Sequence, residues 1–224
     1  MKRRNFSALL ASAPVLGATG AANHALAQGG PIEGRQYMVL NPPLPTTPGK
    51  IEVVEFFWYG CPHCFAFEPT IEAWAKQLPA DVAFRKVHVA FRANVKIHQR
   101  MFYALEAMGK EAATRPAIFN AMHQQGLALD DAKSQAKFLS PLGIDPNKYQ
   151  DAYNSFGVVT KCTQAEKLSE AYRIDGVPSI GVGGRFLTSP SQAAPAGQRL
   201  PELELGQKAL QIADFLIQRA RNKT

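Results

Sequence analysis

Cysteine is scarce in this sequence: the 224 residues include only Cys61, Cys64 and Cys162. Small exported scaffolds held together by disulfides carry several cysteines spread along a short chain, so this protein is not of that type. Two of the three cysteines lie three positions apart. A disulfide that closes so small a loop constrains the unfolded chain little. The pair therefore indicates chemistry rather than architecture.

Apolar runs long enough to span a membrane are also missing, as are basic clusters interleaved with aromatic residues. No apolar run reaches the roughly 18–20 residues that a membrane-spanning helix needs, and no internal repeat is visible. Lysines and arginines do not gather beside aromatic residues, so no nucleic-acid partner is expected. Hydrophobic residues make up 46% of the chain and charged residues 19%, which predicts a folded protein with a sizeable core.

The first 27 residues have the layout of a signal peptide. Three basic residues, Lys2 to Arg4, precede a stretch of small and apolar residues, and Ala25-Leu26-Ala27 offers small residues at a cleavage site. We therefore predict that the protein is exported. Arg3-Arg4 also resembles the start of a twin-arginine signal, so both the Sec and the twin-arginine routes stay open.

A strand–helix–strand unit is predicted between residues 51 and 90. Residues 51–57 (IEVVEFF) are typical of a buried strand. From Cys61 to Leu78 apolar residues recur at helical spacing, and residues 82–90 again have a strand pattern. Such a unit implies two parallel strands joined by a right-handed crossover.

The middle of the chain predicts helices only. Between residues 92 and 172 no strand pattern occurs, and Asp145-Pro146 is a typical N-cap and first-turn pair. Strand patterns return on both sides of Gly183-Gly184, a two-residue hairpin turn. We expect residues 189–201 to form a loop and residues 203–221 a final helix.

These elements predict an α/β protein with a helical insert. Residues 28–91 and 173–224 would form one domain, and residues 92–172 an inserted all-helical domain.

Residues 61–64 combine three features that favour thiol chemistry. Cys61 lies where a strand ends and a helix begins, and the N-terminus of a helix stabilises a thiolate. Pro62 suits the first helical turn because it has no N–H to leave unsatisfied. His63 adds a positive charge or a hydrogen-bond donor beside the thiolate. Cys64 lies one turn further, within reach for a disulfide with Cys61.

The motif, with Glu55-Phe56-Phe57 before it and Phe65-Ala66-Phe67-Glu68 after it, resembles the DsbA family of periplasmic disulfide oxidases. The resemblance extends over residues 33–221 in order. It implies a thioredoxin fold interrupted by a helical domain. It also implies that the Cys61–Cys64 disulfide is a strong oxidant that is transferred to substrate proteins. DsbA is a known example of a cysteine with a low pKa in a strongly oxidising pair.

The resemblance also implies roles for two further pairs of residues. Val177-Pro178 matches the family's second signature, in which the proline is cis and packs against the reactive disulfide; the alternative is an ordinary trans proline. Glu55 lies in an apolar strand, and the resemblance suggests Lys86 as its partner. Glu55 would then either exchange protons with Cys64 or form a plain buried ion pair.

Two further residues, Glu68 and Cys162, each allow two interpretations. Glu68 either tunes the charge of the site or lies on a solvated helix face. Cys162 is either a small buried hydrophobe or a regulatory thiol. Beyond residue 27 and outside the motif, His88, His98 and His123 follow no recognisable pattern, so we expect them to be structural or surface residues.

The partners implied by the resemblance are unfolded exported proteins with free thiols and a DsbB-like membrane oxidase. No metal or organic cofactor is implied, and a monomer is expected. Haem attachment through the motif would need a histidine directly after Cys64, where Phe65 stands. An isomerase of the same compartment would carry a dimerisation domain, for which residues 28–50 are too short.

Overall fold

The computed structural model describes residues 30–46, 48–195 and 197–222. The predicted signal peptide lies outside these residues. From Pro31 onward, the described residues form one compact unit, and the domain boundaries proposed from the sequence stay a prediction. Among the described residues, no helix combines the length and the apolar character needed to cross a bilayer.

A five-stranded mixed sheet forms the centre of the fold, in the order β1-β5-β4-β2-β3. Its strands are β1 (Met38–Val39), β2 (Ile51–Phe57), β3 (Val82–His88), β4 (Ser179–Val182) and β5 (Phe186–Thr188). The predicted parallel pairing of β2 with β3 is confirmed. All other pairs are antiparallel. β2 therefore pairs on one side with β3, the next strand in the sequence, and on the other with β4, which follows the helical insert.

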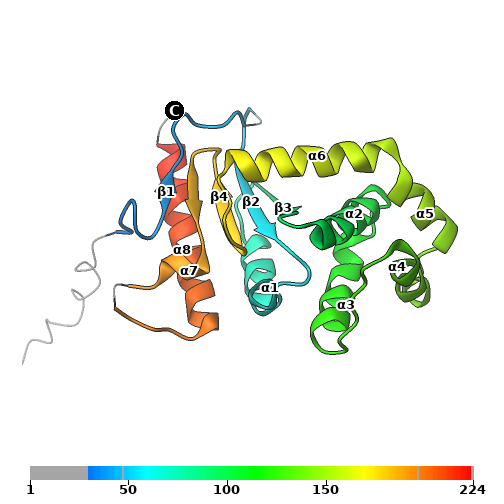
Figure 1. Ribbon diagram of the computed structural model, residues 1–224. Coiled ribbons are helices and arrows are strands. Elements are labelled where there is room, and N and C mark those ends of the chain that lie inside the picture. Colours follow the sequence, from blue (N-terminus) through cyan, green and yellow to red (C-terminus); the bar gives the residue numbers. More distant parts are fainter. Residues whose placement is uncertain (1–29, 47, 196, 223–224) are drawn as a thin grey trace, which may run out of the picture. The chain divides into compact units, whose positions relative to one another are not determined.

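Helices α1 (Pro62–Ala75) and α8 (Glu202–Arg221) pack together beside the sheet. Between β3 and β4 the chain is entirely helical, as predicted, and Figure 1 shows this insert on the β3 side of the sheet. Its helices are α2 (Ala93–Ala107), α3 (Glu111–His123), α4 (Ala132–Leu139), α5 (Pro146–Asn154) and α6 (Phe156–Ala171), with a short 3-10 helix at Ser140–Leu142. The Asp145 side chain caps α5 by accepting hydrogen bonds from two backbone N–H groups.

Two apolar cores border the sheet, and β2 contributes residues to both. Val53 belongs to the core that α1 and α8 cover, whereas Val54 and Phe56 belong to the core shared with the insert. This alternation follows from the period of two in a strand. Glu55 falls on the same face as Val53, and this places a carboxyl group beneath α1.

The predicted hairpin at Gly183-Gly184 is confirmed, whereas the prediction of a loop over residues 189–201 is wrong in part. Gly183 and Gly184 both have positive φ (59° and 63°) and join β4 to β5 in a turn that glycine adopts without strain. The stretch 189–201, predicted as loop, contains the short helix α7 (Pro190–Ala193), whose first turn the Ser189 side chain caps. A serine followed by a proline is a helix-start signal that the prediction overlooked.

Candidate functional site

Cys61 is the N-cap residue of α1, as predicted. Its backbone is extended (φ −87°, ψ 118°), Pro62 occupies the first helical position, and no side chain caps the helix. The unpaired N–H groups of the first turn therefore face the Cys61 sulfur. Cys61 and Cys64 carry free thiols in this structure and are both buried, Cys64 completely.

The loop before β4 covers the pair. The Val177–Pro178 peptide bond is cis, as the resemblance implied. The thiol of Cys61 donates a hydrogen bond to the Val177 carbonyl oxygen (3.4 Å). The two predicted signatures, more than one hundred residues apart in sequence, therefore meet at one sulfur atom. A second cis bond joins Asn41 to Pro42, and the sequence around it does not predict it.

The two thiols have opposite electrostatic environments. The hydrogen bond from the Cys64 thiol, followed by the backbone N–H groups of Cys64 and His63 and the charge of His63, outweighs burial and lowers the pKa of Cys61 to about 6. Burial raises the pKa of Cys64 well above that of a free thiol, and the neighbouring charges of Cys61 and Glu55 add to the effect. At neutral pH the reduced pair therefore consists of a Cys61 thiolate and a Cys64 thiol.

His63 points away from the core, toward the start of α8. Its Nδ1 forms an ion pair with Oε1 of Glu202, and both side chains are largely exposed. The hydrogen bond with Glu202 is the main reason that the pKa of His63 is raised. Glu202 is distant in sequence, so the motif alone does not predict this partner.

Beneath α1, Glu55 and Lys86 form the predicted pair. The Lys86 ammonium group contacts Glu55 Oε2, and both side chains are almost completely buried. Burial raises the pKa of Glu55 to about 7. Burial alone would lower the pKa of Lys86, but the carboxylates of Glu55 and Glu68 outweigh it and leave that pKa above its ordinary value. Glu55 Oε1 makes no hydrogen bond to any described residue.

The pair is part of a larger charge cluster that the sequence did not predict. Lys86 also contacts Glu68 (2.9 Å) and Glu72 (3.2 Å) of α1. Arg115 of α3 binds the same two carboxylates from the other side, at 2.9 and 2.6 Å, and pairs with Glu111 one helical turn away. Glu68 is therefore buried in this cluster, and the reading as a solvated helix face is wrong. In the sequence, Glu111 and Arg115 form only the i,i+4 pair typical of an exposed helix face. The two partners that place Arg115 in the buried cluster, Glu68 and Glu72, lie on α1.

Two histidines hold the turn that leads into Cys61. The backbone N–H of Tyr59 donates to His88 Nε2 (3.3 Å), and His123 Nε2 donates to the Tyr59 carbonyl oxygen (2.8 Å). His88 is fully buried, and burial lowers its pKa to about 3, so the ring stays neutral. The Tyr59 hydroxyl in turn donates to Glu111 (2.7 Å), which connects the turn to the charge cluster.

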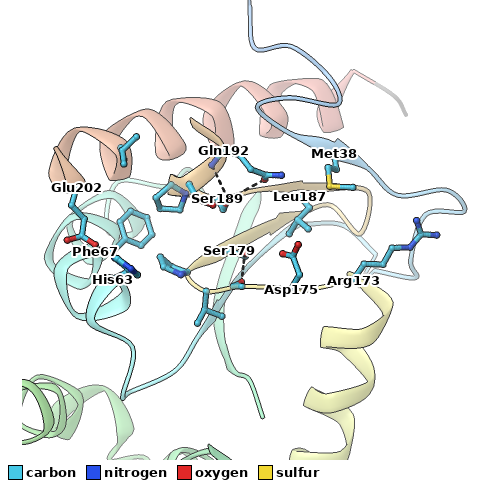
Figure 2. Close-up of a pocket in the computed structure, with 16 residues that line it drawn as sticks. Met38, His63, Phe67, Arg173, Asp175, Ser179, Leu187, Ser189, Gln192 and Glu202 are labelled. Carbon is cyan, nitrogen blue, oxygen red and sulfur yellow. Dashed lines mark hydrogen bonds and ion pairs between the residues drawn. The ribbon is translucent and has the colours of Figure 1, made fainter. Parts of the chain in front are cut away.

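A cavity of about 470 Å³ opens beside the cis proline. Figure 2 shows His63, Phe67 and Glu202 together at one end, with Met38 and Arg173 toward the other. Val177, Pro178, Leu187 and Leu205 add apolar surface. The cavity therefore joins the reactive end of α1 to a largely apolar surface.

A family model described as a DSBA-like thioredoxin domain matches residues 52–204. The chain belongs to the DsbA family. A thiol:disulfide interchange protein DsbA from Burkholderia cepacia is 42% identical over 195 residues, which are 86% of this chain and 87% of the relative. A thiol:disulfide interchange protein DsbA from Pseudomonas aeruginosa (strain PAO1) is 38% identical over 222 residues, which are 99% of this chain and 98% of the relative.

Solved structures agree with this family. A crystal structure of Pseudomonas aeruginosa DsbA has a TM-score of 0.79 and 39% identity, and the match covers 85% of this chain and 95% of that one. DsbA from Xylella fastidiosa has a TM-score of 0.76 and 27% identity, with 86% and 98% covered. The predicted thioredoxin fold with a helical insertion is thus confirmed. The protein is a thiol:disulfide oxidoreductase.

Cys162 lies apart from this DsbA-type site, half-buried on α6. Burial raises its pKa to about 11, so the thiol is protonated and weakly nucleophilic at neutral pH.

In the part of the chain that the structure describes, no group of three or more histidines, cysteines and acidic residues could hold a metal ion.

Proposed function

We propose that this protein donates a Cys61–Cys64 disulfide to proteins that fold after export, through a mixed disulfide at Cys61. The observation that carries the proposal is the asymmetry of the two thiols: a pKa near 6 at Cys61 and a raised pKa at the buried Cys64. A stabilised thiolate favours the reduced form of the pair, and this makes the disulfide form a strong oxidant.

The exchange takes place in two displacements. A substrate thiolate attacks the sulfur of Cys61, the Cys61–Cys64 bond breaks, and Cys64 leaves as a thiolate that takes up one proton. A second substrate thiolate then attacks the substrate sulfur of the mixed disulfide, and Cys61 leaves as a thiolate. Since a thiol of low pKa is a good leaving group, the second step is fast in the direction of substrate oxidation. The substrate gains a disulfide, and the enzyme is left reduced.

Glu55 is proposed to supply the proton that Cys64 takes up. Its pKa of about 7 gives it both protonation states near neutral pH, and its charge acts on Cys64. Lys86 would hold the carboxyl group in place. Glu55→Gln should slow the release of Cys64 and remove an inflection near pH 7 from the rate, with substrate binding intact. An unchanged rate and pH profile would leave Glu55 as a buried ion-pair partner only.

The cavity beside Val177 and Pro178 is the proposed place for the substrate chain. Its apolar lining suits unfolded polypeptides of varied sequence, which share only their cysteines. The backbone of Val177 is positioned at the Cys61 sulfur, where it would pair with an extended substrate.

The place of action and the second partner rest on the family and on the N-terminal sequence. The protein is proposed to work as a monomer in the periplasm, after removal of residues 1–27 by either export route. A DsbB-like membrane oxidase would return Cys61 and Cys64 to the disulfide.

The equilibrium of the mature protein with glutathione buffers tests the proposal. Persistence of the Cys61–Cys64 dithiol under fairly oxidising conditions is the expected result. If instead the disulfide survives strongly reducing buffers, the protein acts as a reductase or carries a structural bond. Cys64→Ala provides a second test, since it should accumulate mixed disulfides at Cys61 that Cys61→Ala cannot form.

A further inference from the structure

The contact between His63 and Glu202 bridges α1 and α8 at one end of the substrate cavity. His63 directly follows the first helical residue of α1, and Glu202 is the first residue of α8. Figure 2 shows the two side chains facing each other beside Phe67. The imidazole that would stabilise the Cys61 thiolate is thus also paired with a carboxylate from a distant element.

We propose that Glu202 is a positioning residue for His63, which keeps the imidazole protonated at neutral pH whether Cys61 is a disulfide or a thiolate. The inference rests on the proposed redox function of Cys61 and Cys64. It assigns Glu202 a part in the redox equilibrium although Glu202 does not touch the sulfur atoms.

The charged groups around His63 support this assignment. Cys61 acts on His63 from its own helix and Glu202 from α8. Arg173 and Asp175, between α6 and β4, line the same cavity and carry opposite charges. Without Glu202, the protonation of His63 would depend mainly on the charge of Cys61, which changes with the redox state.

Proton counting turns this difference into a measurable quantity. With His63 protonated in both states, the oxidised protein and two glutathione thiols give the Cys61 thiolate, the Cys64 thiol, glutathione disulfide and one released proton. If His63 is neutral in the oxidised protein, it takes up that proton when the thiolate forms, and no proton is released. The equilibrium constant for reduction by glutathione therefore rises about tenfold per pH unit when His63 is protonated in both states. It does not change with pH when His63 is neutral in the oxidised protein.

Glu202→Gln tests the proposal through this slope. Exposed ion pairs contribute little to stability, so the variant should fold normally. For the unaltered protein we expect the constant to rise about tenfold between about pH 6.5 and 7.5, where glutathione thiols are protonated. In Glu202→Gln, His63 titrates near its ordinary pKa, and the rise should be clearly smaller. Glu202→Asp should restore part of the slope.

Glu204→Gln is the matched control, because it removes the same charge from the same turn of α8. Glu204 lies at a different surface hollow from His63, and the described residues give it no ion pair. An NMR titration of the oxidised protein supplies a second readout: the pKa of His63 should fall in Glu202→Gln and stay unchanged in Glu204→Gln.

The possible results separate the two proposals. A flattened slope in Glu202→Gln alone supports the role of Glu202. Equal slopes in Glu202→Gln and the unaltered protein, or equal flattening in Glu204→Gln, overturn it and leave the proposed function intact. If the unaltered protein keeps its disulfide in strongly reducing glutathione, the proposed function fails, and the inference about Glu202 fails with it.

Discussion

Replacing Glu55 with glutamine should stabilise the folded protein at pH 8, although it removes one partner of a buried ion pair. Burial raises the pKa of Glu55 from 4.5 to about 7. A carboxyl group whose pKa is raised on folding binds its proton more tightly in the folded state. Its contribution is therefore most favourable below about pH 4.5 and is lost as the pH rises toward 7.

The size of the effect follows from the two pKa values. Ionising Glu55 in the folded protein rather than in the unfolded chain costs about 3 kcal/mol. Glutamine has nearly the same shape, stays neutral, and can still accept a hydrogen bond from Lys86. We therefore expect Glu55→Gln to raise the free energy of unfolding by about 3 kcal/mol at pH 8 and by almost nothing at pH 4. For a chain of this size, the gain at pH 8 corresponds to roughly 6–12 °C in Tm.

Urea unfolding of the reduced proteins at both pH values measures the difference. Glu72→Gln is the control with the opposite sign. Although partial burial acts in the other direction, the charges of Lys86 and Arg115 lower the pKa of Glu72. Its contribution is therefore present above the ordinary pKa and lost in acid, and its removal should destabilise the protein at pH 8. A loss of stability in Glu55→Gln at pH 8, or an equal gain at both pH values, would refute the reasoning.

Three further predictions concern the site and its supports. The ultraviolet absorbance of the Cys61 thiolate should titrate near pH 6. Cys64→Ala should raise that midpoint, because the hydrogen bond from Cys64 is the largest cause of the low pKa. An unchanged midpoint would show that the N-terminus of α1 is sufficient to lower the pKa of Cys61. Arg115→Met should cost about 3–5 kcal/mol in urea unfolding at pH 7, since it leaves buried carboxylates without their partner. The exposed control Arg199→Met should change stability by less than about 0.5 kcal/mol, and equal effects of the two variants would contradict the buried-cluster interpretation. Gly181→Ala should cost about 1–3 kcal/mol, because the added Cβ would clash with the ring of Tyr172. A neutral result in thermal unfolding would show that the ring moves aside.

The sequence predicted those features whose cause is local. Strand β2, the Asp145 cap and the Gly183-Gly184 turn each depend on residues within a few positions, and the structure confirms all three. The features that were missed depend on contacts across the fold. Arg115 reaches α1 from the insert, and nothing in its own helix distinguishes it from a surface arginine.

The same distinction applies to the site. The cysteine motif and the cis proline were predicted because the family resemblance linked two separated signatures. By contrast, the contacts of His88 and His123 with Tyr59 follow from the path of the chain around the turn. A histidine in an apolar stretch has no sequence pattern that names its hydrogen-bond partner.

The position of the insert between β3 and β4 also affects the order in which the site can be assembled. β2, α1 and β3 are made early, yet β2 lacks its second neighbour and Cys61 lacks its contact with Val177 until the insert has been synthesised. Pairing over such a distance in sequence is slow. A chain that emerges N-terminus first would therefore expose the Cys61-Pro62-His63-Cys64 segment before the cis-proline loop covers it, and its own thiols would meet the surrounding redox buffer before the enzyme is complete.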